Sequence, residues 1–212
     1  MASIREQITG KIRDELVAGN FEAGLPLRET QMAKRFGVSR GPVRDAFLQL
    51  SQEGFLAYHS NRGVTVRHPP ALEDRSFVAS LRAQIELYIV HKGFEKLTPE
   101  SHKQIAVALA GLKQACSDKD VIEVAKADME FHRSILQECG GEDFLQTWRQ
   151  LCARMLLTYS RLKSFDEAYA EHEEIFELIK KQDLDNALAA LERNITIAVE
   201  YQPDSENGTD KD

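Results

Sequence analysis

The sequence has few cysteines and no long apolar segment, and each absence excludes a class of protein. Its 212 residues include three cysteines, none at a metal-binding spacing. An odd number of cysteines, in a chain whose N-terminus lacks an apolar signal-peptide core, favours a reducing cytoplasm over a disulfide-linked secreted domain. No run of eighteen apolar residues occurs, so we expect no membrane-spanning helix. No pairing of a nucleophile with a general base is recognisable, which disfavours an enzyme.

The chain is long enough for one or two domains, and its charge divides unevenly along its length. Residues 1–68 carry ten Lys and Arg against seven Asp and Glu, a net charge of +3. The remaining residues carry seventeen against twenty-seven, a net charge of −10. Because salt screens charges over about 8–10 Å, only the charge near a docking face governs contact with phosphate. The asymmetry fits a nucleic-acid-binding part followed by an acidic regulatory part.

A glycine turn is followed by the start of a helix that carries two arginines. Gly37 follows the apolar-periodic segment 29–36, where a glycine in the left-handed conformation would end a helix. Ser39 is a favourable N-cap for the next helix. Arg40 and Arg44 are four residues apart and therefore share one helical face. The pattern predicts a helix-turn-helix whose second helix reads DNA.

Two short strand-like runs follow, at residues 55–59 and 64–68, and predict a β-hairpin. The Asn-Arg-Gly sequence at residues 61–63 has the composition of a hairpin turn. Upstream, the apolar spacing predicts an amphipathic helix at residues 3–18. The hairpin would then be the wing of a winged helix-turn-helix domain spanning residues 1–68.

This first part resembles the N-terminal domain of the GntR family of bacterial transcription regulators. The resemblance covers residues 24–67 and rests on an ordered string: Gly24, Leu27, Glu29, Ala33, Phe36, Gly37-Val38-Ser39-Arg40, Pro42-Val43-Arg44-Asp45-Ala46, Leu50, Gly54 and Arg62-Gly63. Gly41 departs from the family pattern, which usually has threonine there, so the operator sequence stays open. The turn, the second helix and the wing supply the candidate DNA contacts: Arg28, Thr30, Ser39, Arg40, Gly41, Arg44, Arg62 and Gly63.

Two prolines indicate a linker at residues 69–71, and beyond it the apolar residues recur with the helical period. We expect six helices, at about 72–95, 99–115, 120–138, 142–163, 166–182 and 185–201. They predict an antiparallel helical bundle over residues 72–201, in a chain that is mostly α overall. The polar residues 202–212 predict a disordered tail.

Three of these helices carry polar residues on faces that should be buried. Asp128 and His132 lie one turn apart in the third helix. His172 heads the apolar stripe of the fifth helix, and Asn194 lies within that of the sixth. Burying an unpaired polar group costs about 1–3 kcal/mol, so we expect these groups to converge. Either a divalent metal (zinc, nickel or manganese) or a metal-free hydrogen-bonded cluster would satisfy them.

The helical part also resembles a known domain, the FCD ligand-binding domain of the FadR branch. The resemblance rests on Asp128-x-x-Phe131-His132, Glu171-His172-x-x-Ile175, Asp185-x-Ala187 and the segment ending at Asn194. It implies a divalent metal bound by an aspartate and histidines, beside a small carboxylate effector, with Asp128, His132 and His172 as the matching ligands. Asn194 stands where the third histidine is expected, and we assign it to effector binding.

Arg82 lies on the apolar face of the first helix of the bundle. It can pair with Glu86, four residues later. Alternatively, it can anchor the carboxylate of the effector, because a buried arginine forms strong paired hydrogen bonds with carboxylates. Both alternatives stay open, and Arg82 is therefore a second candidate effector-binding residue.

Together these features predict a homodimeric, cytoplasmic transcription regulator that binds a palindromic double-stranded DNA operator and responds to a small carboxylate. The main alternative is a metal-free FCD sensor of acyl-CoA or another large ligand. A metal-dependent hydrolase is a remote alternative, since two histidines and a carboxylate can activate water, but it would not explain residues 24–67. An architectural DNA-binding protein would leave the acidic part without a role.

Overall fold

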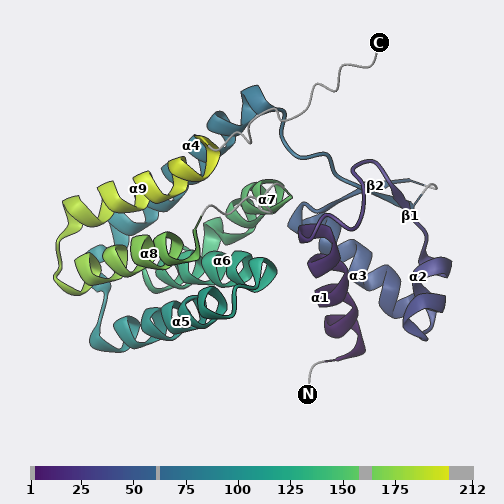
Figure 1. Ribbon diagram of the computed structural model, residues 1–212, viewed down its shortest axis with the longest axis horizontal. Coiled ribbons are helices and arrows are strands. Elements are labelled where there is room, and N and C mark those ends of the chain that lie inside the picture. Colours follow the sequence, from purple (N-terminus) through teal and green to yellow (C-terminus); the bar gives the residue numbers. More distant parts are fainter. Residues whose placement is uncertain (1–2, 61–62, 158–163, 201–212) are drawn as a thin grey trace, which may run out of the picture.

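The computed structural model describes residues 3–60, 63–157 and 164–200, which form an N-terminal winged helix and a C-terminal helical part (Figure 1). The helices of the N-terminal part are α1 (Ile4–Val17), α2 (Glu29–Phe36) and α3 (Arg40–Glu53). The Ser3 side chain accepts a hydrogen bond from the Glu6 backbone and completes a capping box, which fixes the start of α1. The predicted helix-turn-helix is therefore confirmed.

The wing is a three-stranded antiparallel sheet rather than a two-stranded hairpin. Its strands are β1 (Pro26–Leu27), β2 (Leu56–His59) and β3 (Gly63–Val66), in the order β1-β3-β2. The register pairs His59 with Gly63 and Pro26 with Thr65. β1 was not predicted, because a two-residue strand is too short to show an alternating apolar pattern. Arg62, at the predicted turn, lies outside the described residues.

The turn between α2 and α3 has the predicted backbone and the predicted N-cap residue, but that residue makes no side-chain hydrogen bond. Gly37 has a φ of 66° and ends α2 in the left-handed conformation. Ser39 occupies the N-cap position of α3 with extended backbone, as predicted, but its side chain forms no capping hydrogen bond. The tight turn at Gly37 sets the direction of α3 without it, because the Val38 amide bonds back to the Ala33 carbonyl at 3.0 Å.

The helical part follows the predicted order with adjusted boundaries. Its helices are α4 (Leu72–Gly93), α5 (Pro99–Asp118), α6 (Val121–Glu138), α7 (Leu145–Leu156), α8 (Phe165–Lys180) and α9 (Leu184–Glu200). α5 continues three residues past its predicted end and stops where Lys119 adopts a φ of 56°. The predicted helix 142–163 begins instead with a 3₁₀ turn at Glu142–Phe144. Residues 158–163 and the predicted tail 202–212 lie outside the described residues.

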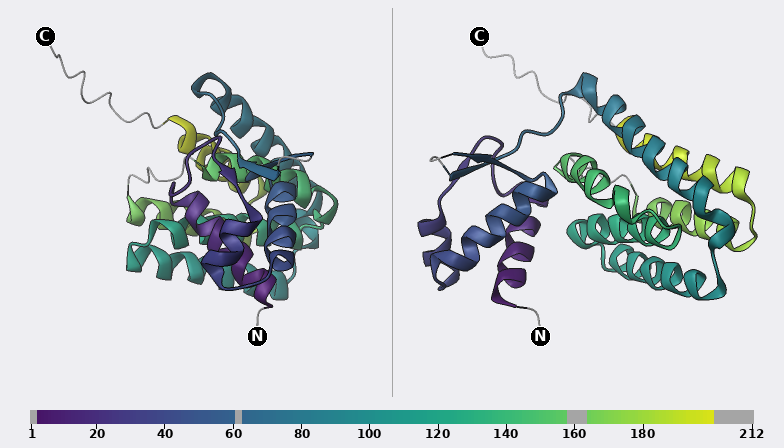
Figure 2. Two further views of the ribbon diagram at one scale, coloured as in Figure 1. Left: turned by 90° about the vertical axis from the view of Figure 1, so that its right-hand side faces the viewer. Right: turned by 180° about the vertical axis from the view of Figure 1, so that it is seen from behind.

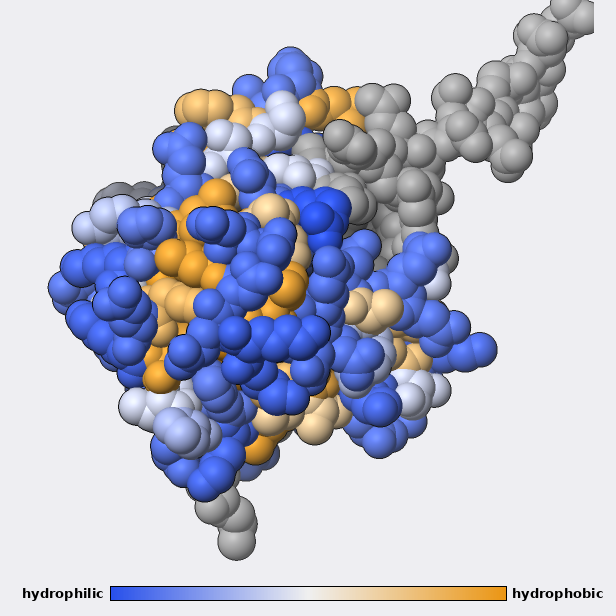
Figure 3. Space-filling model, turned by 90° about the vertical axis from the view of Figure 1, so that its left-hand side faces the viewer, coloured by the Kyte–Doolittle hydropathy of each residue, from blue (hydrophilic) through white to orange (hydrophobic). Residues whose placement is uncertain are grey.

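The helices pack around a main apolar core, whose largest fully buried side chains include Phe131, Ile135, Trp148 and Ile175. A smaller buried cluster joins α5 to the start of α6. α4 lies beside α9, and α5 lies against α6 and α8 (Figure 2). The end of the molecule away from the winged helix is largely hydrophilic, with smaller apolar areas between the charged side chains (Figure 3). Among the described helices, none has the length and apolar character needed to cross a bilayer.

The winged helix packs directly on α6 and α7. Its apolar core includes Ala125 of α6 and Ala153 of α7. The Gln150 amide donates a hydrogen bond to the Gln52 carbonyl at 3.0 Å. Lys126 of α6 forms an ion pair with Asp14 of α1 at 2.6 Å. Because apolar and polar contacts both cross the boundary, a shift of α6 or α7 reaches the winged helix.

Candidate metal centre and DNA interface

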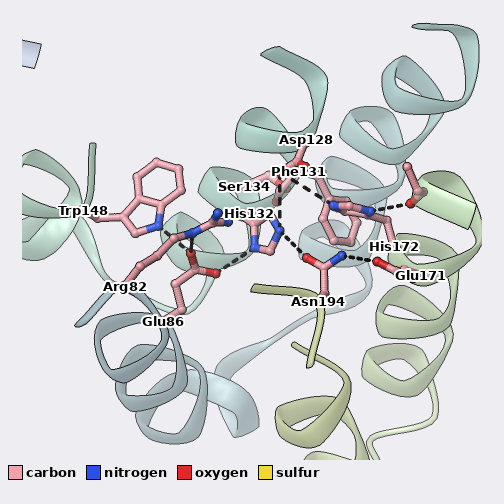
Figure 4. Close-up of polar contacts among 11 residues, drawn as sticks. Arg82, Glu86, Asp128, Phe131, His132, Ser134, Trp148, Glu171, His172 and Asn194 are labelled. Atoms are coloured by element: carbon pink, nitrogen blue, oxygen red, sulfur yellow. Dashed lines mark hydrogen bonds and ion pairs between the residues drawn. The ribbon is translucent and has the colours of Figure 1, made fainter. Parts of the chain in front are cut away.

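Asp128, His132 and His172 meet in the interior of the helical part (Figure 4). One side-chain N or O atom of each lies within 4.8 Å of the others. His132 Nε2 is 3.7 Å from Asp128 Oδ1, and His172 Nε2 is 3.8 Å from the same oxygen. The two histidines are each 1% exposed. The structure thus brings together the three residues that the sequence proposed as metal ligands.

Hydrogen bonds on the outer side of each ring orient both histidines. His132 Nδ1 lies 2.7 Å from Glu86 Oε2, and His172 Nδ1 lies 2.6 Å from the Ala168 carbonyl oxygen. Both of these oxygens are acceptors, so each Nδ1 carries the hydrogen and donates it. In the neutral rings, Nε2 then presents a lone pair toward Asp128. Metal-binding histidines typically donate their outer N–H in this way.

Glu86 of α4 bonds with side chains of α4, α6 and α7 beside the centre. Its Oε1 accepts hydrogen bonds at 2.6 Å from Arg82 Nε and from the Trp148 indole N–H, while Oε2 faces His132. Burial alone would raise the pKa of Glu86, but Arg82 and His132 outweigh it and lower this pKa to about 2. Glu86 is therefore a carboxylate, and Arg82 forms the i+4 ion pair that the sequence allowed.

The charges around the centre favour ionised groups. Burial would raise the pKa of Asp128, but its contact with His172 holds that pKa below the usual range. For His172, burial lowers the pKa and Asp128 raises it by more. For Arg82, the pKa is likewise raised by Glu86 against the effect of burial. Its Nη2 atom is buried without a hydrogen-bond partner among the described residues.

Asn194 of α9 completes the inner side of the cluster (Figure 4). Its Oδ1 lies 3.1 Å from His132 Nε2, and its Nδ2 donates to Glu171 Oε2 at 2.9 Å. With a neutral His132, two acceptors therefore face each other. His172 Nε2 is also buried without a hydrogen-bond partner in the described part of the chain. When both rings are neutral, their lone pairs and the Asn194 oxygen converge, which fits a cation. Binding a metal there would displace the proton that Asp128 favours on His172.

A divalent metal fits this donor set. Bonds of about 2.0–2.2 Å to nitrogen or oxygen place neighbouring ligand atoms about 3.0–3.5 Å apart. The separations of 3.1, 3.7 and 3.8 Å lie in or slightly above that range, and the ligand atoms of Asp128, His132 and His172 all lie within 4.8 Å of one another. Two imidazoles with a carboxylate suit zinc, nickel or manganese.

Arg40 and Arg44 lie on the exposed face of α3, as predicted for a DNA-reading helix. More than half of each side chain is exposed, yet both form ion pairs at 2.9 Å with Glu29 at the start of α2. The hydrogen bond from Arg44 lowers the pKa of Glu29, and the pKa of Arg44 is raised in turn. Both arginines thus share one carboxylate at the surface.

The other candidate DNA contacts lie near this pair on the surface. Arg28, Thr30, Ser39 and Gly41 are all exposed, around the first turns of α2 and α3. Gly63 begins β3 with a φ of 91°, a conformation that favours glycine at this end of the wing.

Sequence reasoning missed the partners that complete each cluster. Glu86 was considered only as a partner of Arg82, and the Trp148 N–H and the Glu29 carboxylate were not assigned to either cluster. A carboxylate on an apolar stripe was the available signal for Glu86, because it requires buried donors. For Glu29, its place at a helix start beside the arginine turn gave no comparable signal.

Comparison with known proteins gives the same two parts. The model of bacterial regulatory proteins of the gntR family matches residues 4–66, and the FCD domain model matches residues 78–196. The probable D-xylose utilization operon transcriptional repressor of Paenarthrobacter nicotinovorans is 24% identical over 219 residues, covering 97% of this chain and 93% of that protein. The gluconate operon transcriptional repressor of Bacillus licheniformis is 24% identical over 204 residues, covering 91% and 82%.

The fold is also found among solved structures. E. coli McbR/YncC matches with a TM-score of 0.75 at 21% identity, covering 94% of this chain and 96% of that one. The family models together span both the winged helix and most of the helical part. The chain belongs to the GntR family of bacterial transcription regulators and carries an FCD domain.

Proposed function

We propose that this regulator binds an operator as a dimer through α3 and the wing, and that its FCD domain holds a divalent metal and a small carboxylate effector. The observation that carries the proposal is the convergence of Asp128, His132 and His172 in a helical part that packs on the winged helix. Without a metal, His172 Nε2 lies 3.8 Å from Asp128 Oδ1 and forms no hydrogen bond within the described part of the chain.

Asp128, His132 and His172 would hold the metal. The bound ion would supply a positive centre for the effector carboxylate, in a place where water is largely excluded. Arg82 pairs with Glu86 through Nε, but its buried Nη2 atom has no hydrogen-bond partner among the described residues and could donate to the effector carboxylate. Names of relatives support a small effector: the gluconate operon repressor is named for a small carboxylate.

Helix α6 offers a direct route from this centre to DNA. Asp128 and His132 lie on α6, and Ala125, one turn earlier, belongs to the apolar core of the winged helix. Met129 packs against both cores. Ligand binding that favours one position of α6 would therefore favour one position of the winged helix. A coupling of about 1–3 kcal/mol would change operator occupancy about 5–150-fold.

At the DNA surface, phosphate or a base edge would replace Glu29 as the partner of Arg40 and Arg44. An exposed ion pair contributes only about 0–1 kcal/mol, so its exchange is inexpensive. Two winged helices related by a two-fold axis would read a roughly palindromic site. The names of the relatives favour repression as the outcome of binding.

The test joins metal content to DNA binding. Duplexes selected from a random pool by the wild-type protein serve as the operator, and a panel of small carboxylates is added with and without chelator. We expect about one equivalent of metal by elemental analysis, and a carboxylate that shifts operator affinity only in the metal-loaded protein. The His132→Ala variant should lose both. Equal metal content in the two proteins would contradict the proposal.

A further inference from the structure

We propose that Asn194 is a fourth protein ligand of the metal, through Oδ1, and that Glu171 holds its amide in the orientation this requires. This inference rests on the proposed metal centre and assigns Asn194 a different role from the effector-binding one that the sequence favoured. The ligand set would then be two imidazole nitrogens, one carboxylate oxygen and one amide oxygen.

The first support is the orientation of the His132 ring. Glu86 Oε1 already accepts hydrogen bonds from Arg82 and Trp148, and its Oε2 lies 2.7 Å from His132 Nδ1, so that nitrogen donates. The other ring nitrogen, Nε2, then faces the centre. Nε2 carries a lone pair unless a second proton is added to the ring.

The second support is the orientation of the amide. Asn194 Nδ2 donates to Glu171 Oε2 at 2.9 Å. The reversed amide would place Oδ1 against the carboxylate, where two acceptors repel each other. Glu171 therefore directs Oδ1 toward His132 Nε2, at 3.1 Å.

The two constraints together place two acceptors 3.1 Å apart in the interior. Two ligands at right angles, each about 2.1 Å from one metal ion, would have this spacing. A second proton on His132 is the rival explanation, and it would satisfy His132 and Asn194. His172 Nε2 would still lie 3.8 Å from Asp128 Oδ1 with no hydrogen bond among the described residues, whereas one ion can bind all three atoms.

Replacing a third imidazole by an amide oxygen should change which metal is bound. Imidazole nitrogen favours zinc and nickel, whereas carboxylate and carbonyl oxygens favour manganese. Asn194 should therefore narrow the gap in affinity between zinc and manganese. Changing Asn194 to histidine should widen that gap.

The experiment titrates metal-stripped protein with Zn²⁺ and with Mn²⁺ by calorimetry. Asn194→Ala and Glu171→Ala should each weaken binding about 10–100-fold, the effect typical of disturbed ligand orientation. Glu171→Gln retains an acceptor oxygen and should retain most of the affinity. Asn194→His should raise the ratio of zinc to manganese affinity about tenfold or more.

Glu174→Ala is the matched control, because Glu174 pairs with Arg193 across the same two helices at 2.9 Å but on the exposed side. It should bind metal like the wild type, and circular dichroism should find every variant folded. If Asn194→Ala binds both metals as the wild type does while His132→Ala does not, Asn194 is not a ligand and the metal centre stands. If the wild type itself binds neither metal, the metal centre fails and this inference fails with it.

Discussion

Two carboxylates in this protein, Glu29 and Glu86, perform similar pairing in opposite surroundings. Glu29 lies on the winged helix between Arg40 and Arg44, both more than half exposed. Glu86 is fully buried and accepts hydrogen bonds from three different helices, including that of its partner Arg82. The same chemistry therefore gives an exchangeable contact at the surface and a fixed one in the interior.

Water accounts for the difference. At the surface, water and salt replace a lost partner at little cost, so an exposed ion pair contributes about 0–1 kcal/mol. In the interior no such replacement exists, and removing one partner leaves a buried charge that destabilises the fold by about 3–5 kcal/mol. A DNA-binding surface requires the first property, because its arginines must change partners. An orienting group behind the proposed metal centre would require the second.

The largest expected effect is the loss of the buried carboxylate. Glu86→Ala leaves Arg82 without its counter-ion and the Trp148 N–H without its acceptor. We expect the free energy of unfolding to fall by about 3–5 kcal/mol in urea titrations followed by circular dichroism. Glu174→Ala, which removes an exposed pair with Arg193, should cost about 1 kcal/mol or less. If both variants lost a similar amount of stability, the buried Glu86 would contribute no more than an exposed ion pair.

The stability that the buried Glu86 carboxylate contributes should depend on pH. Its folded pKa of about 2 lies below the ordinary value of 4.5, so its contribution to stability is present above pH 4.5 and is lost as the pH falls toward 2. Over that window the contribution is on the order of 3 kcal/mol. Glu86→Gln should therefore show a shallower fall in unfolding free energy than the wild type between pH 5 and pH 3.5, a range in which about 1 kcal/mol of this contribution is lost. Parallel curves would mean that Glu86 titrates normally.

A smaller effect is expected where an exposed arginine is removed. Arg44→Ala should weaken binding to the selected operator by about 1–3 kcal/mol in fluorescence anisotropy while leaving the unfolding curve unchanged. Arg35→Ala is the control, because Arg35 is also exposed and pairs with Glu15 in the same domain. Unchanged operator affinity in Arg44→Ala would remove this residue from the DNA interface.

The smallest effect belongs to the surface carboxylate. Glu29→Gln removes the negative charge that Arg40 and Arg44 share, so both become freer to meet phosphate. Affinity for an arbitrary duplex should rise by about 1 kcal/mol or less at low salt, and thermal stability should barely change. Glu15→Gln provides the comparison at the Arg35 pair. A fall in affinity would indicate that Glu29 positions the arginines for binding.

Local sequence patterns predicted most of the helices, because a helix depends on residues that are close together in the chain. The apolar period predicted α1 and the order of α4 to α9, and the glycine predicted the turn at Gly37. The one-turn spacing of Asp128 and His132 also predicted that both would share a face. The 3₁₀ turn before α7 and the short strand β1 were not predicted, since neither has a period to read.

The clusters could be predicted only in part. Burial cost indicated that Asp128, His132 and His172 would converge, and the structure brings them together. The cost of burial could not indicate which donors would bind Glu86, because His132 and Trp148 are 46 and 62 residues away from it in the sequence. The pairing of Glu29 with both arginines depends similarly on how α2 is set against α3.

The sequence by itself determined the family, the order of the helices and which polar residues had to be buried together. Helix propensity, the spacing of apolar residues and the cost of burial all follow from the local sequence. Only the tertiary structure decided that Glu86 orients His132, that Glu171 directs the amide of Asn194, and that α6 contacts the winged helix. These contacts join segments far apart in the chain, and their geometry follows from packing in three dimensions, which no local pattern encodes.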